Sequence, residues 1–169
     1  MMTIRPAAAE DLPAIAALYL QNHRSAYRGL LSEDYLSGLS PDACLEKWAA
    51  ALARPGETIR VAREGDVFLG FAAGTPDGTL PRTWYLESLH VAEAARGRGV
   101  GTALIRAAAR DAAARGCERM SVCVVRGNER AAALYKRLGA AHLLYFEDAF
   151  GGERFASEKL VWETLPVEA

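Results

Sequence analysis

The sequence has 169 residues, a length that fits one domain with its own core, so we expect residues 1–169 to form a single domain. The hydrophobic fraction of 51% and the net charge of −1 are typical of a globular protein and argue against a general nucleic-acid binder. No signal peptide and no run of ~18 apolar residues is present, so we expect a cytoplasmic protein without a membrane partner.

The first half of the chain predicts two longer helices among short strands. In chain order these are a strand at 3–5, a helix from about 10 to 21, a loop or helix break at 27–31, a helix from about 41 to 52, and strands at 58–63 and 67–73. Pro13 falls in the first turn of the first helix, where proline is tolerated. Ser40 and Pro41 are typical of an N-cap and a first helical residue, and they mark the start of the second helix.

The second half alternates strands and helices more regularly. It predicts a strand at 84–91, a helix at 99–115, a strand at 119–125, a helix at 129–138, and strands at 143–147 and 155–162 on either side of Gly151-Gly152. Gly116 and Gly139 stand where the two helices end. This order, without repeats or linkers, predicts one α/β domain with a mixed sheet. The cysteines form no C-x-x-C pair, so neither a disulfide framework nor a metal site is expected.

A glycine-rich turn between a strand and a helix is the most informative feature. Gly97, Gly99 and Gly101 alternate with other residues, and without Cβ atoms they let successive amides point at one spot. These amides begin a helix, whose N-terminus attracts anions. Arg96 and Arg98 add positive charge. The turn therefore predicts a binding site for a diphosphate.

Two common diphosphate motifs do not fit this turn. The dinucleotide pattern G-x-G-x-x-G fails because its last position is Thr102, and the P-loop pattern fails because no Gly-Lys-Ser/Thr follows. Arg96-x-x-Gly99-x-Gly101, preceded by Leu89-His90-Val91, instead resembles the acyl-CoA motif of the GNAT acetyltransferase superfamily.

The resemblance continues downstream of the turn. Asn128, Ala131-Ala132, Tyr135 and Leu138-Gly139-Ala140 are similar to the second cofactor motif of the family, although Ala140 stands where the family commonly has phenylalanine. The resemblance implies a mixed, mostly antiparallel sheet flanked by about four helices. It also implies direct transfer of acetyl from acetyl-CoA to an amine, without a covalent enzyme intermediate.

The resemblance further implies which residues hold acetyl-CoA. The backbone amides of Gly97 through Thr102 would take the pyrophosphate, and main-chain groups of Leu89 and Val91 would pair with the pantetheine. The Val91 amide would also polarise the thioester carbonyl. The full set expected at the cofactor is Leu89, His90, Val91, Arg96, Gly97, Arg98, Gly99, Val100, Gly101, Thr102, Asn128, Ala131 and Tyr135.

Glu87 is the candidate general base. Removing a proton from an alkylammonium group at pH 7 costs roughly 4–5 kcal/mol, so a nearby base is useful. Period-two alternation predicts that Glu87 shares the apolar face of Leu89 and Val91, where a carboxylate binds a proton more readily. An exposed glutamate or an ion-pair partner is the alternative. His90 is expected on the opposite face, with packing or a hydrogen bond favoured over a role as the base.

Tyr135 is the candidate general acid for the departing thiolate. It shares a helix face with Ala131, Leu134 and Leu138, a pattern that also describes an ordinary core tyrosine. The resemblance places a tyrosine of this helix near the CoA sulfur. It also gives Asn128 a hydrogen bond to the pantetheine or to an ordered water, although a plain N-cap is a sufficient alternative.

The acceptor side is less defined. The resemblance implies that the first two helices and the terminal strands hold the acceptor, and an aromatic and acidic lining there would suit a cationic amine. The residues that these regions supply are Tyr19, His23, Tyr27, Arg28, Tyr35, Trp48, Tyr145, Glu147 and Phe150, and a core or solvent-facing position is the alternative for each. The main hypothesis is an N-acetyltransferase for a primary amine on a small molecule, an amino acid or an antibiotic-like compound. The alternatives are a protein N-terminal or lysine acetyltransferase and a non-catalytic acyl-CoA sensor. Homodimers are common in the family, but no interface is visible in the sequence.

Overall fold

The computed structural model describes residues 1–150 and 153–168, without the side chains of Phe150 and Glu153. Gly151-Gly152, which the sequence predicts between the last two strands, lie outside the described residues. The elements are β1 (Met2–Pro6), η1 (Ala9–Asp11), α1 (Leu12–Ala26), α2 (Glu33–Gly38), α3 (Pro41–Ala53), β2 (Thr58–Glu64), β3 (Val67–Pro76), β4 (Thr83–Val91), η2 (Glu93–Ala95), α4 (Val100–Ala114), β5 (Arg119–Val125), α5 (Glu129–Arg137), β6 (Ala141–Phe150) and β7 (Glu153–Trp162), where η marks a 3-10 turn.

The predicted α/β class is confirmed, and the described residues contain five α-helices where about four were expected. The additional helix is α2, which directly follows the predicted loop. It begins because the hydroxyl of Ser32 accepts a hydrogen bond from the amide of Tyr35, at 3.1 Å, as an N-cap does. Leu36 then packs against Leu31 and Phe155 in a small cluster of its own.

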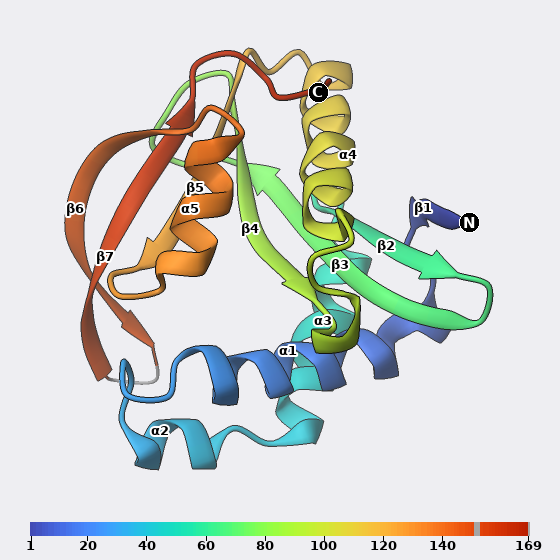
Figure 1. The fold of residues 1–169 in the computed structure, drawn as a ribbon, viewed down its shortest axis with the longest axis vertical. Coiled ribbons are helices and arrows are strands. Elements are labelled where there is room, and N and C mark those ends of the chain that lie inside the picture. The colour runs from blue at the N-terminus through green and yellow to red at the C-terminus, as the bar shows by residue number, and fades with distance from the viewer. Residues whose placement is uncertain (151–152, 169) are drawn as a thin grey trace.

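The strands form one seven-stranded sheet in the order β1-β2-β3-β4-β5-β7-β6. All neighbours are antiparallel except β4 and β5, which run parallel (Figure 1). The parallel pair is short: Thr83–Leu86 of β4 lie beside 119–122 of β5, and the pairing stops there. From that point β4 continues beside β3 only, while β5 continues beside β7. The sheet therefore opens between its two central strands.

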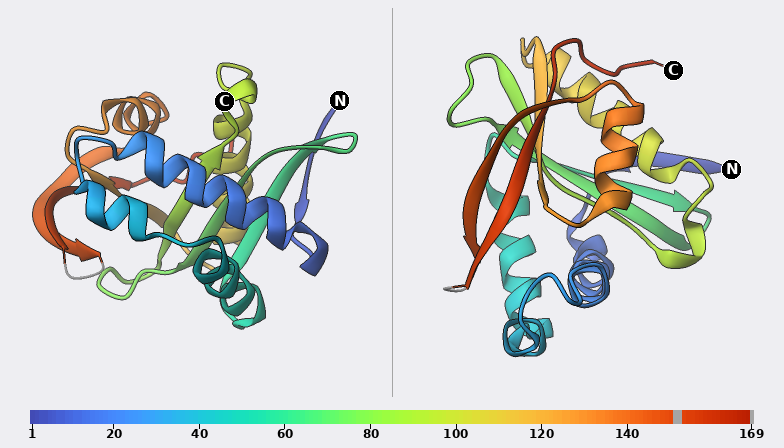
Figure 2. Two further views of the ribbon diagram at one scale, coloured as in Figure 1. Left: turned by 90° about the horizontal axis from the view of Figure 1, so that it is seen from below. Right: turned by 60° about the vertical axis from the view of Figure 1, so that its left-hand side comes forward.

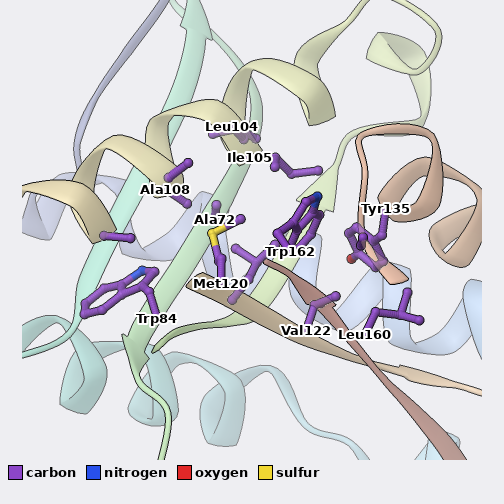
Figure 3. Packing of buried hydrophobic residues seen from close by; sticks show 14 of the residues in the cluster. Ala72, Trp84, Leu104, Ile105, Ala108, Met120, Val122, Tyr135, Leu160 and Trp162 are labelled. Atoms are coloured by element: carbon purple, nitrogen blue, oxygen red, sulfur yellow. The ribbon is translucent and has the colours of Figure 1, made fainter. Parts of the chain in front are cut away.

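Each face of the sheet has its own hydrophobic core. On one face, α4 and α5 cover a cluster that includes Leu104, Met120 and Trp162 (Figure 3). On the other face lie α1 and α3 (Figure 2). They cover a second cluster, which includes the fully buried Trp48 and Phe71. The burial of apolar side chains on both faces fixes the strands, and with them the opening, relative to the helices.

A buried ion pair fixes the point where the parallel pairing begins. Asp77, in the turn before β4, accepts hydrogen bonds from Ser121 of β5 at 2.6 Å and from Lys159 of β7 at 2.8 Å. Burial acts to raise the pKa of Asp77, but the hydrogen bonds from Lys159 and Ser121 outweigh it and hold that pKa well below its usual range. This carboxylate thus ties β4, β5 and β7 together next to the opening.

Candidate active site

A β-bulge in β4 determines which side chains face the opening. Ala73 of β3 lies opposite Ser88 and Gly74 lies opposite Leu86, so Glu87 has no partner on β3. A bulge of this kind bends a strand and turns its side chains. Leu86 lies in the α4 core, and after the bulge Leu89 packs against that same core. Successive residues on the apolar face are therefore three positions apart here, at Leu86 and Leu89, instead of the two positions of a regular strand.

The predicted position of Glu87 is wrong for this reason. Uninterrupted alternation would place Glu87 on the face of Leu89 and Val91, toward α4. The bulge instead directs Glu87 to the other face, where one of its carboxylate oxygens lies 3.6 Å from the ammonium of Lys47 on α3. Its surroundings are therefore not purely apolar. Of the two alternatives, the ion pair is present.

The opening between β4 and β5 is a cavity of about 320 Å³. Glu87 and Tyr135, the two candidate catalytic residues, both line it, and so do Asn128 and Ala131 of the second motif. The other lining residues come from α1, α3 and the strands: Tyr19, Asn22, His23, Ala26, Tyr27, Lys47, Tyr85, Leu86, Ser88, Leu89, His90, Val122, Cys123, Val124, Val125, Asp148, Phe155 and Ser157. Residues of the two motifs, far apart in the sequence, thus meet at one site.

His90 lies on the same side of β4 as Glu87, so the expectation of opposite faces is also wrong. Its ring packs against those of Tyr19, His23 and Phe71, at centroid distances of 5.4, 5.7 and 5.3 Å. Burial, with smaller contributions from His23 and Arg96, lowers the pKa of His90 to about 3. Burial likewise lowers the pKa of His23 to about 4. Both rings are therefore neutral at pH 7.

Asn22 of α1 connects this histidine to the start of the glycine turn. Its amide nitrogen lies 3.3 Å from Nδ1 of His90 and donates to the carbonyl of Val91 at 3.4 Å, while its oxygen accepts from Arg96 at 3.4 Å. Sequence reasoning did not identify Asn22, because nothing in its local sequence distinguishes it from a surface residue of a helix. The side chain is in fact buried.

Tyr135 projects from α5 into the first core, next to Trp162, and its side chain is buried (Figure 3). Burial raises the pKa of Tyr135 well above its ordinary value, with a smaller contribution from Tyr27. The phenol therefore keeps its proton at neutral pH. A protonated hydroxyl at the wall of the cavity suits a proton donor, and the packing of the ring shows that Tyr135 is a core residue as well.

Asn128 occupies the N-cap position of α5, but its side chain forms no capping hydrogen bond. The plain N-cap, which was the alternative to a ligand role, is therefore not what this side chain does. It lines the cavity instead. Its amide is thus placed where a hydrogen bond to a bound molecule can form.

The glycine turn has the conformation that its sequence predicts. Gly97 and Gly99 have φ angles of 79° and 80°, in the left-handed region that favours glycine, and Gly99 is the N-cap of α4. Within the described part of the chain, none of the amides of residues 97–102 donates to a backbone carbonyl; the first helical bond comes from Ala103 to Gly99, at 3.0 Å. Six consecutive donors at a helix N-terminus suit an anion.

The neighbouring side chains contribute less than the sequence suggests. Arg98 forms a two-fold hydrogen bond with the carboxylate of Glu64, at 3.0 Å to each oxygen. Arg96 reaches back to α1, as described above. The side chain of Val100 is buried in the core, so only its amide is available to a ligand. Among the described residues, the turn therefore has free backbone amides, whereas the side chains of its two arginines already have partners.

The free edge of β4 presents main-chain groups to the opening. The amide of Ala92 donates to the carbonyl of Leu69 on β3, at 2.8 Å. Residues of an antiparallel strand direct their main-chain groups alternately to one edge and the other. Leu89 and Val91 therefore direct theirs away from β3, toward the edge that β5 has left. This geometry suits the pairing with an extended ligand that the resemblance implies.

The candidates for the acceptor side divide into several groups. Tyr19, His23 and Tyr27 line the cavity, as expected. The remaining candidates do not: Trp48 is fully buried in the α1/α3 core, Tyr35 of α2 packs against the small cluster around Leu36, Arg28 lies at a groove between α1 and α3, Tyr145 and Glu147 are exposed on β6, and the side chain of Phe150 lies outside the described residues.

Besides Asn22, sequence reasoning did not identify the cavity residues Lys47, Tyr85 and Asp148. Lys47 precedes the candidate Trp48, Asp148 follows the candidate Glu147, and Tyr85 lies two positions before the candidate Glu87. Period-two alternation could have indicated Tyr85, on the face of Glu87, but no local pattern indicates Lys47 or Asp148. On the 1–150 and 153–168 segments, no helix is long and apolar enough to cross a membrane.

Comparisons with known proteins agree with this geometry. A model of the "Acetyltransferase (GNAT) family" matches residues 20–140. A thialysine N-epsilon-acetyltransferase from Bos taurus is 36% identical over 95 residues, which are 56% of this chain and 54% of that protein. The chain thus matches about half the length of this curated relative.

Solved structures resemble the whole fold. A GCN5-related N-acetyltransferase from Rhodopseudomonas palustris superposes with a TM-score of 0.76 at 25% identity, over 94% of this chain and 93% of that one. The PaiA N-acetyltransferase from Thermoplasma acidophilum, solved in complex with coenzyme A, shares the fold with a TM-score of 0.72 at 18% identity, over 94% and 99% of the chains. Because the family model covers well over half of its residues, the chain belongs to the GNAT family of acetyltransferases.

Proposed function

We propose that this protein transfers the acetyl group of acetyl-CoA to a primary amine of a small molecule. The observation that carries the proposal is the divergence of β4 and β5, which brings Glu87 and Tyr135 into one cavity beside a free strand edge. Family membership supports the reaction class. The name of the bovine relative, which specifies an ε-nitrogen, supports an amine as the acceptor.

The cofactor would lie along the free edge of β4 and end at the glycine turn. The amides of residues 97–102 would hold the pyrophosphate, and Leu89 and Val91 would pair with the pantetheine through main-chain groups. The amide side chain of Asn128, which forms no capping bond, would donate to the same arm. In this arrangement the thioester lies in the opening between the strands.

The catalytic groups would act on opposite sides of the thioester. Glu87 accepts a proton from the acceptor ammonium, and the freed amine nitrogen attacks the carbonyl carbon. The new C–N bond forms as the C–S bond breaks, and Tyr135 donates its proton to the leaving sulfur. The nitrogen then loses its second proton, which restores the phenol, while Glu87 releases its proton to solvent. One ammonium and one thioester thus become one amide, one thiol and one proton.

Thiol release from acetyl-CoA in the presence of a set of small primary amines tests the proposal. We expect acetyl-CoA-dependent turnover with at least one amine, and we expect Tyr135→Phe to lower kcat by about 10²-fold or more with little change in the Kd for acetyl-CoA. Tyr35→Phe, outside the cavity, is the matched control. Cofactor binding without turnover on any small amine or peptide would indicate the acyl-CoA sensor, and turnover on peptides alone would indicate the protein acetyltransferase.

A further inference from the structure

The acceptor side of the cavity contains a positive charge, which is unusual in a site that is to receive an ammonium group. Lys47 lines the cavity on the same side as Glu87, and its ammonium lies 3.6 Å from the Glu87 carboxylate. The ammonium also lies over two aromatic rings, 5.2 Å from that of Trp48 and 5.8 Å from that of Tyr19. Contacts of this kind attract a cation and restrict where it lies. The positive charge is therefore held at the proposed base.

A simple amine would bind poorly beside this charge. An ammonium that binds Glu87 competes with Lys47 for the carboxylate, and Lys47, which lies 3.6 Å from one of its oxygens, repels that ammonium. An acceptor that also carries a carboxylate avoids both costs, because its carboxylate pairs with Lys47 when its ammonium reaches Glu87. The pair thus favours an acceptor with both signs of charge.

A third charged group completes the pattern. Asp148 of β6 lines the same cavity, and in the described part of the chain its carboxylate accepts a hydrogen bond from the Ala149 amide and forms no ion pair. The cavity histidines, His23 and His90, are neutral at pH 7, as shown above. The charged side chains lining the cavity are therefore two carboxylates and one ammonium. The complementary ligand has two ammonium groups and one carboxylate.

We propose that the acceptor is a diamino acid and that Lys47 selects it by pairing with its carboxylate. This inference depends on the proposed acetyltransferase function, which it refines. Glu87 receives one amine of the acceptor, Asp148 pairs with the other, and Lys47 excludes diamines that lack the carboxylate. Lys47 acts here as a binding residue and takes no part in the proton transfers.

L-lysine and three analogues test this inference, because each analogue lacks one charged group of lysine. Cadaverine lacks the carboxylate, 6-aminohexanoate lacks the α-amine and L-norleucine lacks the ε-amine. We expect the wild-type kcat/KM to be highest for lysine and about tenfold lower for cadaverine, the effect of losing one charge-assisted contact. Lys47→Met should reduce the ratio of kcat/KM for lysine to that for cadaverine about tenfold, and Lys47→Arg should largely restore it.

Lys136→Met is the matched control. Lys136 is also partly exposed and also lies 3.6 Å from a glutamate, Glu158, but it does not line the cavity. Its loss should leave the lysine-to-cadaverine ratio as it is. Equal use of lysine and cadaverine by the wild type, or an unchanged ratio in Lys47→Met, would overturn the inference while acetyl transfer itself stands. If none of the amines is acetylated although acetyl-CoA binds, the proposed function fails instead.

Discussion

Replacing Gly99 with glutamate would place a carboxylate among the amides that we propose hold the pyrophosphate. Gly99 begins α4, and a Cβ built there meets no other atom within 4 Å, so the new side chain has room. Two unit charges about 5 Å apart repel each other by roughly 3 kcal/mol at an effective dielectric constant of ~20. Repulsion of this size weakens acetyl-CoA binding by about 10²-fold.

Thermal unfolding with and without acetyl-CoA measures this loss. At a ligand concentration of about 100 times its Kd, binding stabilises the wild type by about 2.7 kcal/mol. In a chain of this size, that corresponds to a rise in Tm of roughly 5–11 °C. For Gly99→Glu, the same concentration is close to the new Kd, and the stabilisation falls to about 0.4 kcal/mol, a rise of roughly 1–2 °C.

Gly116→Glu separates this effect from backbone strain. Gly116 follows the opposite end of α4, has a φ of 79° against 80° at Gly99, and also has open space around a built Cβ. Both variants should lower the Tm of the free protein, because a side chain in the left-handed region costs about 1–2 kcal/mol. Only Gly99→Glu should lose the shift caused by acetyl-CoA. A full shift in Gly99→Glu would refute the assignment of the turn to the pyrophosphate.

Two further predictions concern ionisation in the cavity. Glu87→Gln should reduce kcat/KM strongly at pH 7 and less at pH 9, because more of the acceptor amine is already deprotonated at pH 9. A loss of kcat/KM that does not depend on pH would argue that Glu87 binds the acceptor rather than acting as the base. The pKa of His23 is about 4 in the fold against roughly 6.5 in the unfolded chain, so below pH 6.5 the unfolded chain takes up the proton first. Protonation of His23 should therefore lower the free energy of unfolding by about 3 kcal/mol between pH 6.5 and 4, and His90, whose pKa is about 3 in the fold, should contribute a similar amount. Urea denaturation of His23→Gln should show roughly half of this combined dependence removed, whereas an unchanged slope would contradict the burial argument.

Features that depend on local sequence were predictable. The hydroxyl of Ser40 accepts from the amide of Ala43, at 3.0 Å, and Pro41 begins α3, as the cap pattern indicates. The glycine turn adopts its positive φ angles because the residues themselves favour them. In each case the interaction joins residues within one turn of the chain. The turn could be located in the sequence for this reason, and its binding of a diphosphate stays a prediction.

Features that depend on contacts between distant segments were not predictable. The bulge at Glu87 exists only in the register of β4 against β3, and the two consecutive polar residues Glu87 and Ser88 do not by themselves specify it. Lys47 and Asp148 reach the cavity because α3 and β6 pack where they do, one on each side of the opening. No local pattern distinguishes them from solvated charges. The acceptor side was therefore the part of the site that sequence reasoning defined least.

The bulge explains how one strand can serve both the core and the chemistry. A regular strand that keeps Trp84 and Leu86 against α4 would also direct Ser88 and His90 toward that core, and it would turn Leu89 and Val91 outward. With one extra residue at Glu87, the apolar residues on both sides of it face α4, while Glu87 and His90 both face α1 and α3. The main-chain groups of Leu89 and Val91 remain at the free edge, because β5 has already turned away to β7. A single unpaired residue thus gives the strand a continuous apolar face and a carboxylate in the cavity, and the departure of β5 leaves an open edge that suits an extended ligand.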